Sequence, residues 1–489
     1  MSNKTLRTGL SLVFVCMSLA GCASYSGLGT EGSSLEAKSL KAAQTLKGVS
    51  VTPAAWPQKD WWKRLGDGQL DGLIQEALRD SPDMQIASAR AHQASAAAGA
   101  ANAARMPTLD AEADVTRSRL ARSQDPSGRG GVYDTVRDVN LTFNYTFDLW
   151  GGQRDAWEAA LGEARAAEVD GQAASLTLAA DVARAYSSLG HAYSVRDLAN
   201  DDLARTRQML DLSKRRLQAG IDSHYQYQQT ESLEASSQEQ VINAEKQLKS
   251  ARIALAVLLG KGPDRGIEIA RPKILAPGAV ALPSTLPAEL LGRRPDLVAA
   301  RWRVEAASKN IAAAKTRFYP NLNLTAAAGT QSLLGDALFG SASRFFNIAP
   351  AVSLPIFDGG RLRAGLDAED ANYDLAVAQY NKTLVAALGD VSDTLEQLKA
   401  MGLQIGAQQR AADIAQESYN TGLQRYESGV GNYLDVLSIE QQLLQAQRQL
   451  ADLNAEQIDL SIQLMQALGG GFEPGNTAAA VPTQASLAE

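Results

Sequence analysis

The stretch Val139-Asn-Leu-Thr-Phe-Asn-Tyr-Thr-Phe-Asp-Leu149 decides the fold, because apolar and polar residues alternate along its whole length. This period-two pattern is typical of a β-strand with one apolar and one polar face. Its eleven residues match the length that a tilted strand needs to cross a bilayer. Three further stretches are alternating or apolar. We therefore expect four strands, at about 109–117, 139–149, 322–329 and 348–357.

The expected strands differ in their connecting loops and in their proline content. The first two form a hairpin with a long polar loop between them. Pro350 and Pro355 weaken the last strand, because proline cannot donate a ladder hydrogen bond. They favour an edge position, a bulge or the two ends of the strand.

A very long helix follows the strand at 139–149. Gly151-Gly152 comes directly after it, and no proline occurs before Pro263. Residues 153–219 are rich in Ala, Leu, Arg, Glu and Gln, which are good helix formers. At about 1.5 Å per residue, such a helix spans about 100 Å. The sequence therefore predicts an elongated helical body and no large globular core.

The same construction occurs twice along the chain. Asp358-Gly359-Gly360 precedes a second proline-free stretch, 361–428. Gly151 corresponds to Gly359 at an offset of 208, and Gly220 to Gly429 at an offset of 209. A near-constant offset indicates an internal duplication.

Each long helix turns back at a glycine. Gly220 precedes Ile-Asp-Ser and Gly429 precedes Val-Gly-Asn, which is the order of a C-terminal glycine cap followed by a new N-cap. The return helices are expected at 223–259 and 432–468. Heptads follow the long helices and indicate close, supercoiled packing. One ladder is Val182, Leu189, Leu203, Leu210 and Leu217, broken by Arg196, and the other is Val391, Leu398, Ile405, Ala412, Tyr419 and Tyr426.

The N-terminus has the layout of a signal peptide. Lys4 and Arg7 precede an apolar run that is too short to span a bilayer, and Leu19-Ala-Gly-Cys22 follows it. These four residues resemble a bacterial lipobox, which makes Cys22 the expected lipidated residue. The alternative is an ordinary signal peptide with incidental cysteines. Cys16 leaves with the signal, so the mature chain has no pair of cysteines for an intrachain disulfide and no cysteine-based metal site.

Composition argues against several functional classes. The net charge of −7 gives no reason to expect nucleic-acid binding. The three histidines, His92, His191 and His224, have no metal-ligand spacing. No glycine-rich phosphate loop or nucleophile elbow occurs. We therefore expect neither an enzyme nor a cofactor or metal site.

Four strands cannot close a barrel alone, because open edges in lipid leave backbone groups without hydrogen-bond partners. Several chains must therefore contribute to one barrel. Two copies supply eight strands and three supply twelve. The physics of the sequence does not choose between them.

Several motifs together resemble the TolC/OprM-type outer-membrane efflux proteins, in particular the NodT-like lipoprotein branch that is partnered with resistance-nodulation-division (RND) pumps. Besides the lipobox and the duplicated unit they are Asp148-Leu-Trp-Gly151, Arg293-Arg-Pro-Asp-Leu297, Phe318-Tyr-Pro-Asn-Leu322, Leu354-Pro-Ile-Phe-Asp-Gly-Gly360 and Tyr426-Glu-Ser-Gly-Val-Gly-Asn-Tyr-Leu-Asp-Val-Leu437. The resemblance implies a mainly α fold with a β-barrel portion. It implies a homotrimer, whose twelve-stranded barrel sits in outer-membrane lipid and continues into a periplasmic helical tunnel. The implied function is a passive exit duct for small molecules that an inner-membrane RND-type pump and a periplasmic adaptor deliver.

The expected organisation has six parts. They are a signal peptide (1–21), a tether with an equatorial segment (22–68), a first repeat (69–262), a linker (263–287), a second repeat (288–470) and a disordered tail (471–489).

The same resemblance assigns functional residues to the turns between long and return helices. The adaptor is expected to meet the hairpin tips at Gly220, Ile221, Gly429, Val430 and Gly431. A gate is expected nearby, where a ring of carboxylates from three chains would attract cations. Its candidate residues are Asp413, Glu417, Arg425, Tyr426 and Asp435.

Other functions stay open at this point. A structural, envelope-spanning coiled-coil lipoprotein explains the heptads and the lipobox but not the alternation at 139–149. Within the channel class, type I protein secretion and metal-ion efflux are alternatives to small-molecule efflux. The lipobox and the scarcity of histidine favour small molecules.

Overall fold

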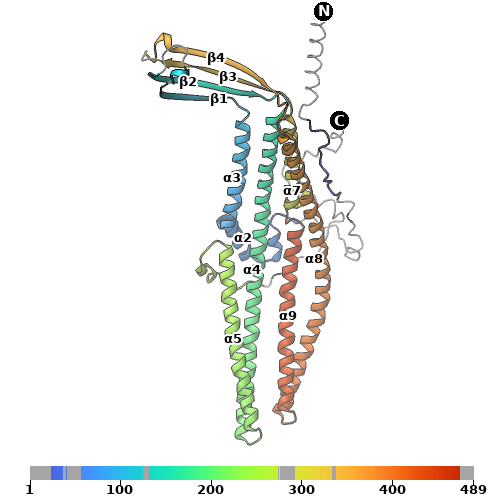
Figure 1. Ribbon diagram of the computed structural model, residues 1–489. Helices are drawn as coiled ribbons and strands as arrows, with labels where there is room; N and C mark the ends of the chain where they lie inside the picture. Colours follow the sequence, from blue (N-terminus) through green and yellow to red (C-terminus); the bar gives the residue numbers. More distant parts are fainter. Residues whose placement is uncertain are drawn as a thin grey trace, which may run out of the picture. The chain divides into compact units, whose positions relative to one another are not determined.

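The computed structural model describes residues 24–36, 40, 57–119, 121–124, 131–273, 275, 292–332 and 337–473 (Figure 1). The expected signal peptide, Cys22, the second half of the linker and the tail from 474 lie outside these residues. None of the helices in the described part combines the length and the apolar character that a bilayer-crossing helix needs.

One long helix and one return helix dominate each half of the chain, and their lengths are the same in both halves. The longer ones, α4 (Gly152–Gln218) and α8 (Arg361–Glu427), have 67 residues each. The return helices, α5 (His224–Leu258) and α9 (Tyr433–Ala467), have 35 each. These ends lie within one or two residues of those expected from the sequence. Shorter helices complete the set, namely α2 (Gly68–Asp80), α3 (Pro82–Ala103) and α7 (Pro295–Thr316).

The aspartate before each glycine pair starts the long helix. Asp148 accepts hydrogen bonds from the backbone N–H groups of Gln153 and Arg154, at 3.1 and 2.9 Å. Asp358 accepts one from the N–H of Leu362 at 2.8 Å. A carboxylate in this place satisfies free N–H groups of the first turn and interacts favourably with the helix dipole.

The four strands form one antiparallel sheet in the order β1-β2-β3-β4. They are β1 (Thr108–Arg119), β2 (Tyr133–Phe147), β3 (Asn321–Ser332) and β4 (Arg344–Ser353), drawn at the top of Figure 1. β1 and β4 are the edge strands of this sheet, and Pro350 lies in the edge strand β4.

Two expected strands had wrong bounds. The strand expected at 139–149 begins at Tyr133, because its pairing with β1 continues to Arg119, and it ends before the helix cap Asp148. The strand expected at 348–357 lies at 344–353, because Arg344 pairs with Thr330 and Pro355 cannot extend the ladder. The loop between β1 and β2 is therefore shorter than expected.

The two faces of the sheet differ in chemistry, as the alternation predicts. On the apolar face, large side chains have 50–82% of their surface exposed; they are Leu109, Val115, Leu141, Phe346, Ile348 and Val352. On the polar face, Thr142 donates to Asn140 at 3.0 Å and Thr146 donates to Asn323 at 2.9 Å. A sheet with one face for lipid and one for water has the pattern of a membrane barrel.

The chain divides into two compact units, and both halves of the sequence contribute to each. One unit comprises Met1–Ser34, Ala91–Ala167 and Ala300–Tyr380, and it contains the sheet. The other comprises Leu35–Arg90, Glu168–Ala299 and Asn381–Glu489, and it contains both hairpin turns.

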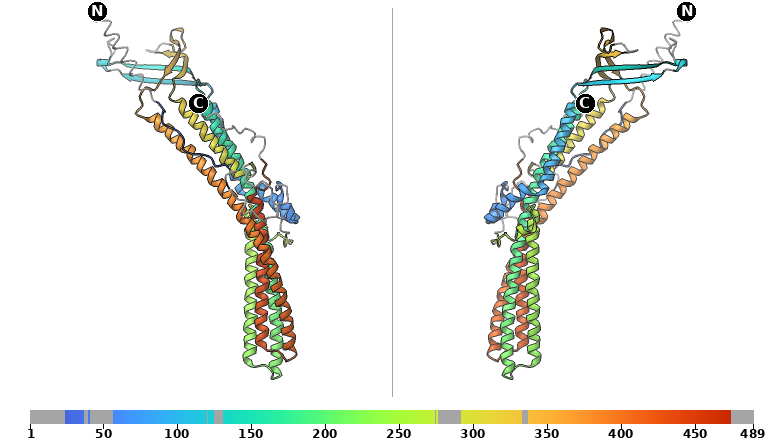
Figure 2. Two further views of the ribbon diagram at one scale, coloured as in Figure 1. Left: turned by 90° about the vertical axis from the view of Figure 1, so that its right-hand side faces the viewer. Right: turned by 90° about the vertical axis from the view of Figure 1, so that its left-hand side faces the viewer.

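In the second unit, the later parts of α4 and α8 run beside α5 and α9 as two helical hairpins (Figure 2). Most of the heptad residues form their buried seam, whereas Leu210, Leu217 and Ile405 are only half-buried. Val182, Leu189 and Val391 are at most 1% exposed, and Tyr419 and Tyr426 are at most 6% exposed. Val182 and Leu189 belong to an apolar cluster that also includes Trp61 and Trp62 with Leu70, Ile74 and Leu255, so these tryptophans have a packing role.

Candidate functional site

The turns between long and return helices have the same backbone construction. Gly220 and Gly429 adopt φ angles of 74° and 75°, in the left-handed region that favours glycine. The N–H of Ile221 bonds the carbonyl of Arg216, and the N–H of Val430 bonds that of Arg425, as in a Schellman cap. Ser223 then caps α5 with Gln226, and Asn432 caps α9. We call residues 216–223 the first tip and residues 425–433 the second tip.

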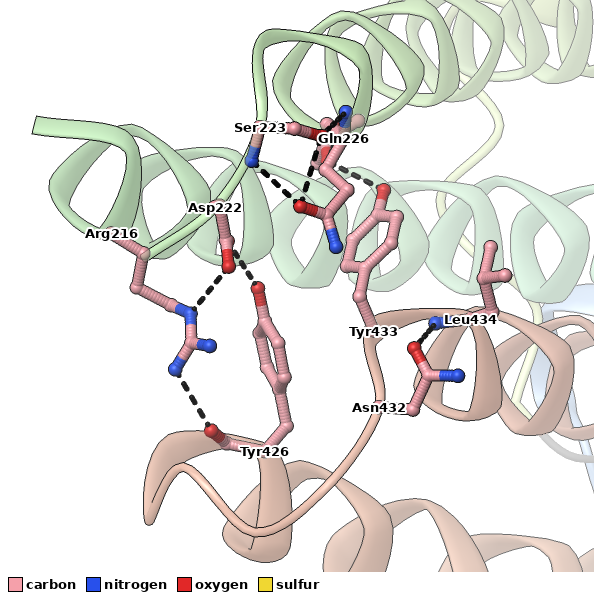
Figure 3. A network of polar contacts seen from close by, with 9 residues as sticks. Arg216, Asp222, Ser223, Gln226, Tyr426, Asn432, Tyr433 and Leu434 are labelled. Atoms are coloured by element: carbon pink, nitrogen blue, oxygen red, sulfur yellow. Dashed lines mark hydrogen bonds and ion pairs between the residues drawn. The ribbon is translucent and has the colours of Figure 1, made fainter. Parts of the chain in front are cut away.

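The two tips are joined by a buried polar network (Figure 3). Asp222 of the first tip accepts a hydrogen bond from the Tyr426 hydroxyl at 2.7 Å and one from Arg216 Nε at 3.0 Å. Arg216 also donates to the backbone carbonyl of Tyr426 at 3.3 Å, and its guanidinium lies 4.4 Å from the centre of the Tyr426 ring. We call these three residues the latch. The latch therefore holds the second tip to the first through one carboxylate and one guanidinium.

A second contact joins the two hairpins beside the latch, where the centres of the Tyr426 and Tyr433 rings are 5.9 Å apart. The Tyr433 hydroxyl makes a short hydrogen bond with the Thr230 hydroxyl of α5. Tyr426 and Tyr433 are each 1% exposed. Burial and the hydrogen bond to Asp222 raise the pKa of the Tyr426 hydroxyl, so it stays protonated and donates to Asp222.

The residues expected to form the gate divide into two groups. Glu417, Arg425 and Asp435 are exposed and line one groove with Val430 and Gly431. Asp413 is exposed and accepts a hydrogen bond from Gln409 at 2.9 Å. Tyr426 is buried in the latch and lies away from this surface.

The residues expected to contact the adaptor lie on the turns. Ile221 and Val430 are 63% and 73% exposed, although both are apolar. Gly220 and Gly429 are also exposed, and Gly431 is half-buried. Each tip therefore presents one large apolar side chain beside small residues.

Sequence reasoning did not identify Arg216, Asp222, Thr230 or Tyr433. The internal repeat points to only one of these residues. Arg216 corresponds to Arg425 at the offset of 209, but Arg216 is inside the latch and Arg425 is exposed. The duplicated helices are therefore not equivalent at their tips, and only the three-dimensional contact reveals which arginine is used.

A second buried group of charges lies between the hairpins. Glu440 of α9 is 3% exposed, and Arg205 of α4 lies 3.8 Å from it and 3.7 Å from Asp202. Within the described residues, neither Glu440 oxygen has a hydrogen-bond partner. Burial, with the nearby Asp202, raises the pKa of Glu440 to about 7, while Arg205 opposes the rise. This carboxyl is therefore poised to change its charge near neutral pH.

In the described part of the chain, no group of three or more His, Cys, Asp or Glu side chains is arranged to hold a metal ion.

Comparisons with known proteins agree with this architecture. Residues 73–261 and 286–470 match the family described as "Outer membrane efflux protein". The chain is 31% identical to the multidrug resistance outer membrane protein MdtP of Escherichia coli strain K12, over 94% of this chain and 95% of MdtP. It is 36% identical to the fusaric acid resistance protein FusA of Burkholderia cepacia, over 74% of this chain and 69% of FusA.

A solved structure extends the likeness to the fold. The outer membrane protein VceC of Vibrio cholerae is 36% identical and superposes with a TM-score of 0.79, covering 86% of this chain and all of the VceC chain. The duplicated helices, the two-faced sheet and these matches agree, and the chain belongs to the outer membrane efflux protein family.

Proposed function

We propose that the two tips form the periplasmic entrance of the duct and that the latch holds this entrance closed. The protein is an outer-membrane channel of a tripartite efflux system. The observation that supports the gate is the latch itself, because Arg216, Asp222 and Tyr426 tie one helical hairpin to the other. Separating the hairpins breaks these bonds.

The strength of the latch suits a device that opens on demand. A buried hydrogen bond contributes about 1 kcal/mol, and one to a charged group about 1.5–3 kcal/mol. The latch therefore contributes a few kcal/mol in each chain. Binding of partners at the tips can supply that much differential free energy.

Cells expressing latch variants test this gate. Tyr426→Phe keeps the ring and removes the hydroxyl that donates to Asp222. Tyr419→Phe is the matched control, since Tyr419 is buried on the same helix one heptad earlier. We expect Tyr426→Phe and Asp222→Asn to sensitise cells to a large antibiotic that the outer membrane normally excludes. Equal sensitivity of the wild type, these variants and the control would overturn the latch as a gate.

We further propose that three chains close the barrel. β1 and β4 are the edges of the four-stranded sheet, so each chain offers one edge to each neighbour. Three chains give the twelve strands that the family resemblance implies. The same sheet argues against the alternative of a purely structural coiled-coil lipoprotein, which has no use for an exposed apolar β face.

The exposed tips are the proposed docking surface for the periplasmic adaptor of an RND-type pump, with Gly220, Ile221, Gly429, Val430 and Gly431 in contact. Ile221 and Val430 are large apolar side chains in contact with water, which favours a protein partner. A Val430→Glu variant should lose adaptor cross-linking and efflux. Leu403→Glu, at a residue of α8 that is 79% exposed, is the control. Unchanged cross-linking in Val430→Glu would place docking elsewhere.

The exposed charges Asp413, Glu417, Arg425 and Asp435 are the proposed lining of the entrance. Two carboxylates and one guanidinium share a groove, so three chains would form a predominantly acidic ring. Charge-neutral substitutions of Glu417 and Asp435 should reduce the preference of the open channel for cations. The same preference in the variants would rule out this lining.

We propose small organic compounds as the cargo, because the relatives FusA and MdtP are named for resistance to fusaric acid and to multiple drugs. The partner pump supplies the energy, and the chain itself catalyses no reaction.

Cys22 is the proposed lipid attachment site. Palmitate labelling that persists in Cys22→Ser would refute it.

A further inference from the structure

Four arginines lie on the apolar face of the sheet, beyond its apolar band. The register places Val115 opposite Arg137, Arg117 opposite Thr135, and Thr330 opposite Arg344. Side chains at directly opposed positions point to the same face of a sheet. Arg119 follows Arg117 by two residues on that face. We call Arg117, Arg119, Arg137 and Arg344 the arginine belt, and all four are exposed.

The belt lies at the loop end of the sheet. β1 and β3 begin directly after helices α3 and α7, while Arg119 and Arg344 adjoin the loops at the opposite ends of the strands (Figure 1). By the family architecture the helices enter the periplasm. The loop end therefore faces the cell exterior, and the belt is level with the headgroups of the outer leaflet.

An aromatic side chain supports the belt. Tyr133 is 63% exposed and lies on the same face, opposite Arg119. The Arg117 and Arg119 guanidinium groups lie 5.3 and 5.7 Å from the centre of its ring. Tyrosines typically gather where a barrel meets the membrane–water interface. Arg117 and Arg137 are diagonal neighbours on adjacent strands, which are typically about 7–8 Å apart and within reach of one anionic group.

Charges on the sheet are sorted by sign between its faces. The polar face of the same hairpin has Asp110, Glu112, Asp114, Asp134 and Asp138, with Asp114 directly opposite Asp138. The apolar face has the four arginines. Solubility alone requires no such sorting. A partner of negative charge on the lipid side of the sheet accounts for it.

We propose that the arginine belt binds the phosphate groups of the anionic glycolipid in the outer leaflet of the outer membrane. Guanidinium groups match phosphate oxygens with paired N–H donors, and arginine is more weakly hydrated than lysine. The apolar band below the belt contacts the acyl chains of the same lipid. The proposal rests on the outer-membrane location and not on the latch, so either can fail without the other.

The test measures binding of lipid A, a phosphorylated glycolipid, to the purified full-length protein in detergent. Dephosphorylated lipid A and inorganic phosphate are the comparison ligands. The test variant is Arg117→Gln/Arg119→Gln/Arg137→Gln/Arg344→Gln. The matched control, Asp110→Asn/Glu112→Gln/Asp114→Asn/Asp138→Asn, neutralises as many charges on the polar face. Helix content by circular dichroism and the oligomer band on gels confirm folding of each variant.

We expect the wild type to prefer phosphorylated lipid A. Each arginine removed should weaken binding about fivefold, and the quadruple variant should bind about 600-fold more weakly if the four effects multiply. The control variant should bind at least as tightly as the wild type. Equal binding of dephosphorylated lipid A, equal binding by the folded arginine variant, or full competition by millimolar inorganic phosphate would each overturn the proposal. If the quadruple variant fails to fold, the Arg137→Gln and Arg344→Gln single variants replace it, with the same fivefold expectation.

Discussion

At the residue scale, Glu440 makes stability depend on pH. Its folded-state pKa of about 7 lies above the ordinary value of 4.5, so the folded chain holds this proton more tightly than the unfolded chain. The contribution of this bound proton to the free energy of unfolding is fully present below about pH 4.5 and is lost as the pH rises through 7. Ionisation of Glu440 above pH 7 therefore lowers the stability of the folded chain by up to about 3 kcal/mol. The charged and titratable groups around it are Asp202, Arg205, Tyr419 and Tyr433.

The variant Glu440→Gln should therefore remove part of the pH dependence. We expect thermal unfolding of the wild type to occur at a lower temperature at pH 8 than at pH 5.5. The variant should be more stable than the wild type at pH 8 and close to it at pH 5.5, because Arg205 keeps Asp202 as a partner. Glu427→Gln, at an exposed residue of α8, is the control. Parallel pH profiles for Glu440→Gln and the wild type would contradict this account.

At the element scale, the sheet has one face for lipid and one for water. Leu141 lies on the apolar face of the central strand β2 and is 50% exposed, while Asn140 lies on the polar face. Leu141→Arg should reduce the stability of the folded barrel by about 2–4 kcal/mol, the cost of an arginine near the middle of a bilayer. Asn140→Arg should cost much less. Unfolding in lipid vesicles measures both, and equal losses would refute the assignment of faces.

Two glycines of the second tip should respond differently to alanine. At Gly429 a Cβ meets nothing within 4 Å, so Gly429→Ala costs only the left-handed conformation, about 1–2 kcal/mol. At Gly431 a Cβ would lie 2.9 Å from the backbone N of Tyr426, which must move. Hydrogen exchange should show the latch loosened in Gly431→Ala more than in Gly429→Ala. The reverse order would mean that Gly431 does not position Tyr426.

The same elements show how far the sequence predicts the structure. Helix ends could be predicted within two residues, because Gly220 and Gly429 terminate helices by local backbone chemistry. The start of β2 was missed by six residues, since Tyr133–Asp138 is a strand only through its pairing with β1. Tyr426 was identified as a candidate, but its partner Asp222 is 204 positions away, and no periodicity reports such a contact. The separation of acidic residues and arginines onto opposite faces of the sheet became visible only once the register of the strands was known.

At the scale of the whole molecule, we propose a passive, trimeric channel that is closed at its tips until partners bind. The edges of one four-stranded sheet require neighbours, and the latch joins the hairpins within each chain. Both properties can be measured on one purified sample. The most direct measurement is single-channel conductance in a planar lipid bilayer, with the mass of the oligomer determined in parallel. We predict a trimer that conducts rarely as the wild type and opens often as Tyr426→Phe. A monomer or dimer, or a trimer that conducts equally with and without the latch hydroxyl, would contradict the account.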